Sequence, residues 1–158
     1  MKTLAECLQT LPQRHQNALG WFLTRRGTIH PWPAPLADGT LLAAKPKGIY
    51  KPAWSRYALS VRENFGSDYR DKEPVSRPDG TWLYRYFQEN ANPQERDREF
   101  ANRGLLQCRD DAVPVGVMRQ VSSKRPCRYA ILGVAYVRSW EEGYFLLEGF
   151  NSKGMARG

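Results

Sequence analysis

The feature that most constrains the fold is a series of short strand-forming runs between Tyr57 and Phe150. The segments "YALSV" and "TWLYRYF" follow a period of two, and the turn sequence "RPDG" precedes the second. Three more β-rich runs follow, "AVPVGVMRQV", "YAILGVAYVRSW" and "GYFLLEGF". A period of two between Gly- and Pro-containing turns is typical of strands. The sequence therefore predicts a body rich in β-sheet.

Two other segments carry helical signals. Residues 3–26 repeat apolar side chains at helical spacing, Pro12 breaks or restarts the pattern, and Gly27 ends it. In "ANPQERDREFANRGLL", Asn92 is a candidate N-cap and Pro93 occupies the first turn. The predicted fold is α+β. It combines a strongly curved sheet or barrel with an N-terminal helical extension and one or two packed helices.

Charge and length narrow the class of protein. The chain has 158 residues, which suits one domain, and carries 24 Lys+Arg against 16 Asp+Glu, for a net charge of +8. Arg outnumbers Lys, and Arg pairs with phosphates and stacks on flat rings. This composition favours nucleic acid as the partner. The first residues lack the long apolar stretch of a secretory signal, and the sequence has no apolar run of about 20 residues, so we expect a cytoplasmic protein without a membrane partner.

The sequence does not favour catalysis. Its three cysteines are widely separated, and only His15 and His30 could join them in a metal site. No phosphate-binding glycine loop is present, and no nucleophile has a nearby base. Asp68, Asp71 and Glu73 could hold Mg²⁺, but solvated loop charges are the simpler interpretation. We predict no catalytic residue, no metal and no cofactor.

The last third of the chain carries the most specific pattern. "NRGLLQCRDDAVPVGVMRQV" is followed by "RYAILGVAYVRSWEEGYFLLEGF", and "KGIYKPAWSRYALSVRENFGSD" lies upstream. In this order the segments resemble the SET-and-RING-associated (SRA) domain, a modified-cytosine reader of the PUA-like superfamily. The resemblance covers about residues 45–150 and implies an SRA-like or PUA-like β-barrel.

A second resemblance includes the N-terminal region. The stretch "ALGWF" at 18–22, the Trp32-Pro33 connector, "GIYKP" and "LYRY" are similar to the N-terminal domains of prokaryotic modification-dependent HNH endonucleases. This implies a helical extension and Pro-rich connector over 1–44, an SRA-like domain over 45–150 and a flexible tail over 151–158. It also implies a type IV restriction role, with the HNH nuclease in a further domain or a partner.

The SRA resemblance implies a pocket for a flipped base in duplex DNA that carries 5-methylcytosine or 5-hydroxymethylcytosine. Aligning the loop from Tyr57 makes Phe65 the first stacking ring, Asp68 the carboxylate that accepts the cytosine N4 hydrogens, and Tyr86 the second ring. An alternative register uses Tyr69 and Asp71. We favour the first register.

The period of two places Tyr86 on one face of its strand with Trp82 and Tyr84. Either all three rings line the cavity, or the strand bends, or Tyr86 belongs to the core. The sequence leaves these alternatives open.

The resemblance also implies that a turn before the "GI" pair approaches the groove, while basic side chains contact phosphates. The candidate DNA-binding residues are Lys45, Pro46, Lys47, Lys51, Arg56, Arg119, Lys124, Arg125 and Arg128. The alternatives to a modified-DNA reader are an RNA-binding PUA-like module, a non-specific nucleic-acid binder and an atypical nuclease.

Overall fold

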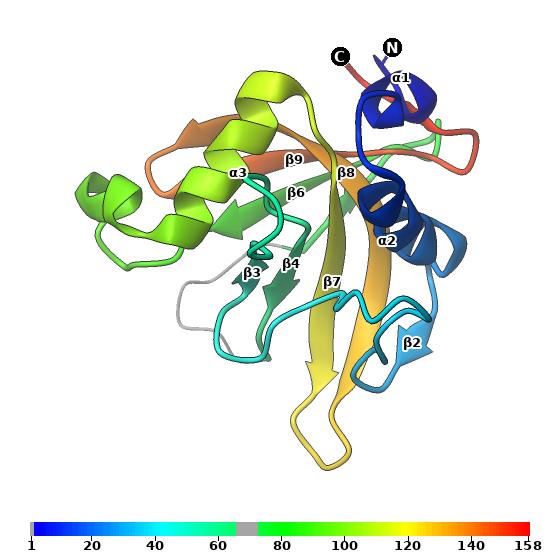
Figure 1. Ribbon diagram of the computed structural model, residues 1–158, viewed down its shortest axis with the longest axis horizontal. Coiled ribbons are helices and arrows are strands. Elements are labelled where there is room, and N and C mark those ends of the chain that lie inside the picture. The colour runs from blue at the N-terminus through cyan, green and yellow to red at the C-terminus, as the bar shows by residue number, and fades with distance from the viewer. Residues whose placement is uncertain (1, 66–72) are drawn as a thin grey trace.

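The computed structural model describes residues 2–65 and 73–158, and it combines one large sheet with helices (Figure 1). The helices are α1 Leu4–Leu8, α2 Gln13–Thr24, the 3-10 helix η1 Pro93–Arg98 and α3 Phe100–Asp111. The strands are β1 Lys2–Thr3, β2 Ile29–His30, β3 Ile49–Tyr50, β4 Ser60–Glu63, β5 Val75–Ser76, β6 Trp82–Phe87, β7 Val115–Ser122, β8 Arg128–Glu141, β9 Tyr144–Gly149 and β10 Met155–Ala156.

The main sheet follows the order β3-β4-β7-β8-β9-β6-β5, and β2 adds to β8 at one end. The β4–β7 pair is parallel, whereas the other neighbours in this sheet are antiparallel. Among the described residues, β3 and β5 are the two edges of this path and do not pair with each other. The sheet is therefore open rather than a closed barrel.

Strand β8 gives the sheet its curvature. Its first half pairs with β7, its second half pairs with β9, and Ala135 is opposite both Val115 and Gly149. The register shifts near Gly133, where φ is +123°, and again between Val137 and Ser139. Such bulges bend a strand and increase its twist, so one long strand can serve both halves.

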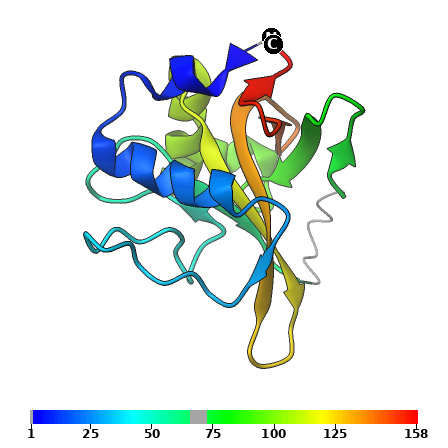
Figure 2. The same cartoon turned by 90° about the vertical axis from the view of Figure 1, so that its right-hand side faces the viewer.

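Beyond the β9 pairing, β7 and β8 continue as a long hairpin (Figures 1 and 2). Residues 122–128 form its end, which we call the hairpin tip. The Pro-rich segment after β2 and the segment that leads to β3 lie beside this hairpin in both views.

Helix α2 packs on β7 and β8 through a close aromatic contact. Phe22 is fully buried, and a side chain at Gly116 of β7 would overlap its ring. Pro12 precedes the helix as its N-cap, which agrees with the predicted restart of the helical pattern. The predicted cap at Asn92 is also present, because its side chain accepts a hydrogen bond from the backbone N–H of Gln94.

The aromatic face of β6 points into the core. Trp82, Tyr84 and Tyr86 are all buried, and the alternate residues are half-buried. Trp82 lies opposite Gly149, where a Cβ would overlap its indole ring. The predicted shared face is therefore present, and it is an interior surface.

The two termini meet in a small separate sheet (Figure 2). Strand β1 pairs with β10, with Lys2 opposite Ala156 and Thr3 opposite Met155. Ala156 is fully buried, so the segment predicted as a flexible tail instead pairs with the N-terminus. Its polar sequence hides this contact because the pairing uses backbone groups.

The α+β fold with a large curved sheet and packed helices is confirmed. The N-terminal extension is not set apart from the rest, because Leu4, Leu11, Leu19 and Phe22 belong to the same core as the strands.

His15 is a buried polar group in α2. Its ring is inaccessible and meets Trp54 edge-on, and neither ring nitrogen has a hydrogen-bond partner among the described residues. Burial lowers the pKa of His15 from 6.5 to about 4, because a charged imidazolium would lose its hydration. The folded protein therefore holds His15 neutral.

We predict that His15 makes folding sensitive to acid. Between pH 6.5 and about 4 the unfolded chain binds a proton that the folded chain does not, so stability falls as pH falls. The loss from this group reaches about 3 kcal/mol below that range. Urea unfolding against pH should show this component in the wild type and in the His30→Gln control, and His15→Leu should lack it. An identical pH profile for His15→Leu would contradict the prediction.

Candidate nucleic-acid interface

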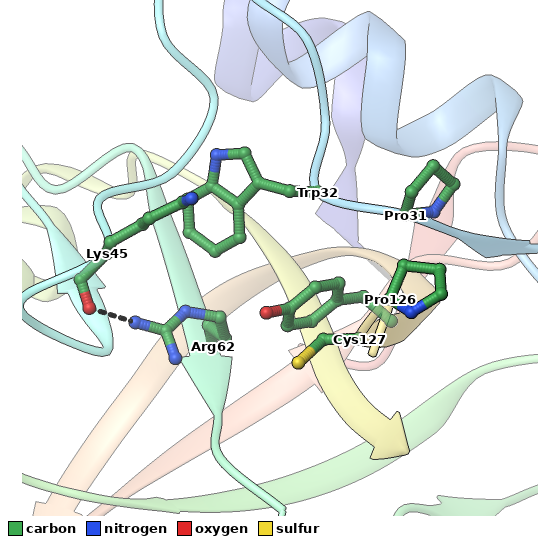
Figure 3. A pocket seen from close by; sticks show the side chains of 7 residues that line it. Pro31, Trp32, Lys45, Arg62, Pro126 and Cys127 are labelled. Atoms are coloured by element: carbon green, nitrogen blue, oxygen red, sulfur yellow. Dashed lines mark hydrogen bonds between the residues drawn. The ribbon is translucent and has the colours of Figure 1, made fainter. Parts of the chain in front are cut away.

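A hollow of about 500 Å³ lies between the Pro-rich connector, the segment before β3, β4 and the hairpin tip (Figure 3). We call it the Trp32 hollow; its lining residues are Pro31, Trp32, Lys45, Arg62, Pro126, Cys127 and Tyr129. Trp32 and Tyr129 meet edge to face, with ring centroids 5.5 Å apart. The pairing of β2 with Tyr129 and Ala130 places the connector there. The lining thus offers flat apolar surface beside cationic groups.

Arg62 builds one wall of the Trp32 hollow. Its guanidinium donates to the carbonyl oxygens of Ala44, Lys45 and Lys47 at 3.0, 3.0 and 3.2 Å, and also to the Asn64 side chain. Figure 3 shows the bond to Lys45 as a dashed line. Arg62 is only 6% exposed, yet its Nε has no partner among the described residues. One guanidinium therefore fixes the turn before β3 and keeps one buried donor unused.

The segments around the Trp32 hollow carry no acidic residue. Asp and Glu are absent from residues 7–37, 39–62 and 112–140, and these ranges include every lining residue. Lys124, Arg125 and Arg128 on the hairpin tip are exposed, and none forms an ion pair with another described residue. Lys45 is exposed as well. This surface is therefore positively charged, and no carboxylate of residues 2–65 and 73–158 pairs with the cations of the hairpin tip.

The predicted second stacking ring, Tyr86, is covered in this structure. It is 4% exposed, and its hydroxyl donates to the backbone carbonyl of Arg62 at 3.2 Å. Gly48 makes room for that hydroxyl, because a Cβ at Gly48 would overlap the Tyr86 oxygen and lie 2.7 Å from the Arg62 carbonyl. The "GI" turn and Tyr86 are thus neighbours, while the stacking role of Tyr86 stays a prediction.

The other predicted pocket residues follow β4. Phe65 is 56% exposed, and its backbone N–H donates to Gln120 Oε1 at 3.1 Å. Asp68, Tyr69 and Asp71 lie outside the described residues. Both registers for the base pocket therefore stay predictions.

Arg119, a predicted DNA contact, binds two carboxylates. Its guanidinium is 3.0 Å from Glu63 and 2.7 Å from Glu73, on either side of the segment that holds Asp68 and Asp71. Burial raises the pKa of Glu63, and the bond to Arg119 lowers the pKa of Glu73. In this geometry Arg119 joins the two ends of that segment rather than facing solvent.

The remaining predicted contacts are distributed over two places. Pro46, Lys47 and Lys51 line a second hollow of about 300 Å³ beside Phe100. Lys47 is 3.6 Å from Glu99, and the Lys51 ammonium donates to the Ser55 carbonyl at 2.5 Å. Arg56 is away from both hollows and pairs with Asp111 on α3. Of the predicted DNA contacts, only Lys45 lines the Trp32 hollow. Lys124, Arg125 and Arg128 belong to the hairpin tip, which contributes Pro126 and Cys127 to the lining.

Sequence reasoning missed Arg62 and Tyr129 as lining residues. Trp32 is visible in the sequence as an anchor in a Pro-rich connector, but its partner is about a hundred residues away along the chain. The available signal is the absence of acidic residues from all three segments that meet there.

Two further observations concern only the described residues. They contain no group of three or more His, Cys, Asp or Glu side chains that could hold a metal ion. No helix among them is long and apolar enough to cross a membrane.

Comparisons with known proteins give matches among solved structures. No family model and no curated protein matches the chain. The chain is similar to the SUVH5 SRA domain in complex with fully methylated CG DNA, at 20% identity and a TM-score of 0.44 over 66% of this chain and 74% of that one. A hemimethylated CG complex of SUVH5 SRA matches at 20% identity and a TM-score of 0.42, over 70% and 83% of the two chains. KRYPTONITE, in complex with mCHG DNA and SAH, matches at 20% identity and a TM-score of 0.39, over 63% of this chain and 24% of that one. Two of these three solved structures are thus of the SUVH5 SRA domain.

We predict that Gly48→Ala destabilises the protein, because the new methyl group would overlap the Tyr86 hydroxyl and crowd a backbone carbonyl. Overpacking of this kind costs about 1–3 kcal/mol. Gly20→Ala is the matched control, since nothing lies within 4 Å of its Cβ position in α2 and alanine is the better helix former. Urea unfolding should show a loss for Gly48→Ala and a small gain for Gly20→Ala. Equal stability of Gly48→Ala and wild type would contradict this packing.

Proposed function

We propose that the protein binds duplex DNA that carries a modified cytosine, 5-methylcytosine or 5-hydroxymethylcytosine. The observation that carries the nucleic-acid part is the acid-free, positively charged surface around the Trp32 hollow, where Lys45 and the hairpin tip meet. Exposed Lys and Arg without carboxylate partners are the side chains that neutralise phosphates and release counterions. The modified-cytosine part is supported by the ordered SRA-like motifs over about residues 45–150.

The proposed mechanism is base flipping. Extracting a base from the duplex costs a few kcal/mol, which stacking and a specific carboxylate contact would offset. Phe65 and Tyr86 are the proposed rings and Asp68 the proposed acceptor for the cytosine N4 hydrogens. Since Tyr86 is covered by the turn at Gly48, stacking by Tyr86 requires that this turn shift when DNA binds.

The proposed biological role is that of a specificity domain in a modification-dependent endonuclease. The nuclease would be an HNH domain of the same protein or a partner, as the second resemblance implies. The competing function is non-specific or RNA binding, which the same basic surface could support.

Fluorescence anisotropy with matched duplexes tests the proposal. Unmodified DNA is compared with duplexes that carry 5-methylcytosine, 5-hydroxymethylcytosine or N6-methyladenine, and an RNA duplex serves as competitor. We expect tighter binding to a modified-cytosine duplex than to the other ligands. Equal affinity for all of them would overturn the proposal and leave a general nucleic-acid binder.

We predict that Asp68→Ala removes the preference for modified cytosine and leaves weaker, salt-sensitive binding. The remaining affinity comes from phosphate contacts, which carry no sequence information. Asp71→Ala is the matched control and should keep the preference. The reverse result, with Asp71→Ala losing it, would favour the alternative register, and a preference retained in both variants would exclude both carboxylates.

We predict that the double variant Lys124→Gln/Arg125→Gln weakens binding to every duplex alike. Each lost phosphate contact reduces the slope of log affinity against log salt by about 0.9, so the slope should fall by about 2. Arg98→Gln/Arg109→Gln removes the same charge from side chains that pair with carboxylates, and it should bind like the wild type. Equal effects of the two double variants would contradict the proposed interface.

A further inference from the structure

We propose that the Trp32 hollow is a second nucleotide subsite, which holds one unpaired base with an exocyclic carbonyl oxygen where adenine and cytosine have an amino group, as in thymine or guanine. This deepens the proposed function, since the subsite would act on the same nucleic acid. Its lining residues differ from Phe65, Asp68 and Tyr86, which are proposed for the cytosine pocket.

The size and lining of the Trp32 hollow suit a flat ring. Its volume of about 500 Å³ lies within the range of about 300–1,000 Å³ that is typical of small-molecule sites. Trp32 is half-buried and keeps part of its ring accessible, while Tyr129 supports it from the side with its plane at 78°. Pro31 and Pro126 add apolar surface at the rim. Stacking on such a platform does not depend on which base is present.

Hydrogen bonding supplies the selectivity. The donors at the site are the Lys45 ammonium and the Tyr129 hydroxyl. Burial raises the pKa of Tyr129, so this hydroxyl keeps its proton at neutral pH. Among the described residues, no carboxylate lines the hollow to accept an amino hydrogen. Thymine has the carbonyl oxygen O4 and guanine has O6, whereas cytosine and adenine have an amino donor at the corresponding position.

Positive charge lies beside the stacking ring of the Trp32 hollow. Lys45 and Arg62 lie 5.4 Å from the Trp32 ring centroid, so positive charge also surrounds the stacking position.

Six-nucleotide single strands test the subsite without a modified duplex. The probes are a thymine strand, an adenine strand and an abasic strand of the same length, followed by anisotropy and by tryptophan fluorescence. We expect the thymine strand to bind tightest although adenine stacks more strongly, and the abasic strand to bind weakest. Preference for adenine, or equal binding of the abasic strand, would overturn the proposal in favour of simple stacking or phosphate binding.

Two tryptophan variants locate the contact. Trp32→Phe keeps a flat ring, so it should bind the thymine strand within a few-fold of wild type and lose most of the fluorescence quenching. Trp140 lines a different hollow, together with Asn92 and Gln94, so its fluorescence should not report on the strand. Trp140→Phe should therefore show the same quenching as the wild type. Trp32→Ala should weaken binding about 5- to 150-fold. Unchanged quenching in Trp32→Phe would place the strand elsewhere.

The hydroxyl of Tyr129 gives an independent readout that leaves the stacking surface intact. Tyr129→Phe should reduce the ratio of thymine to adenine affinity while both strands still quench Trp32. An unchanged ratio would remove Tyr129 from the subsite. Failure of these single-strand tests leaves modified-duplex binding untouched, and equal binding of all duplexes leaves the single-strand result untouched, so the two proposals can fail separately.

Discussion

The set of bonds made by Arg62 is the interaction on which the candidate interface depends. From β4, its guanidinium reaches the carbonyls of Ala44, Lys45 and Lys47, and thereby fixes the turn that leads into β3. The same turn holds Gly48 against the Tyr86 hydroxyl and places Lys45 beside Trp32. Because hydrogen bonds to a charged group are stronger than neutral ones, this turn is firmly attached to the sheet. The surroundings of Tyr86 and of Trp32, the two rings proposed to stack on bases, therefore both depend on the buried side chain of Arg62.

The charged residues are unevenly distributed over the molecule, which the net charge of +8 does not show. Residues 89–111 contain six carboxylates, and three of the four cations there pair with them: Arg96 with Asp97, Arg98 with Glu95 and Arg109 with Asp110. The hairpin tip and the segment before β3 have cations alone. A nucleic acid would thus be attracted to one surface, and long-range attraction would orient the encounter before any specific contact forms.

Much of the fold follows from local sequence. The period of two in "TWLYRYF" predicts β6 and its shared aromatic face, and Pro12 and Asn92 mark helix starts that the structure confirms. The sequence could not reveal that β1 pairs with β10, because backbone pairing between the two ends of a chain leaves no pattern in either segment. The curvature of the sheet likewise depends on bulges in β8, whose positions the period of two does not reveal.

The site was less predictable than the fold. Lys45 and the hairpin tip follow from charge and motif order, whereas Arg62 and Tyr129 look in the sequence like ordinary strand residues. For Arg119 the sequence predicted a phosphate contact, whereas in the structure its guanidinium is bonded to Glu63 and Glu73. Whether a cation is free depends on carboxylates that are distant in sequence, and a single sequence does not place them.

Amide hydrogen exchange of the protein with and without a saturating 5-methylcytosine duplex tests the central claim most directly. The account predicts slower exchange over residues 44–48 and 122–129 in the complex, where the acid-free surface meets DNA. It also predicts little change over residues 93–111, where Arg96, Arg98 and Arg109 are paired with carboxylates. Protection of residues 93–111 with unchanged exchange at the hairpin tip would contradict it.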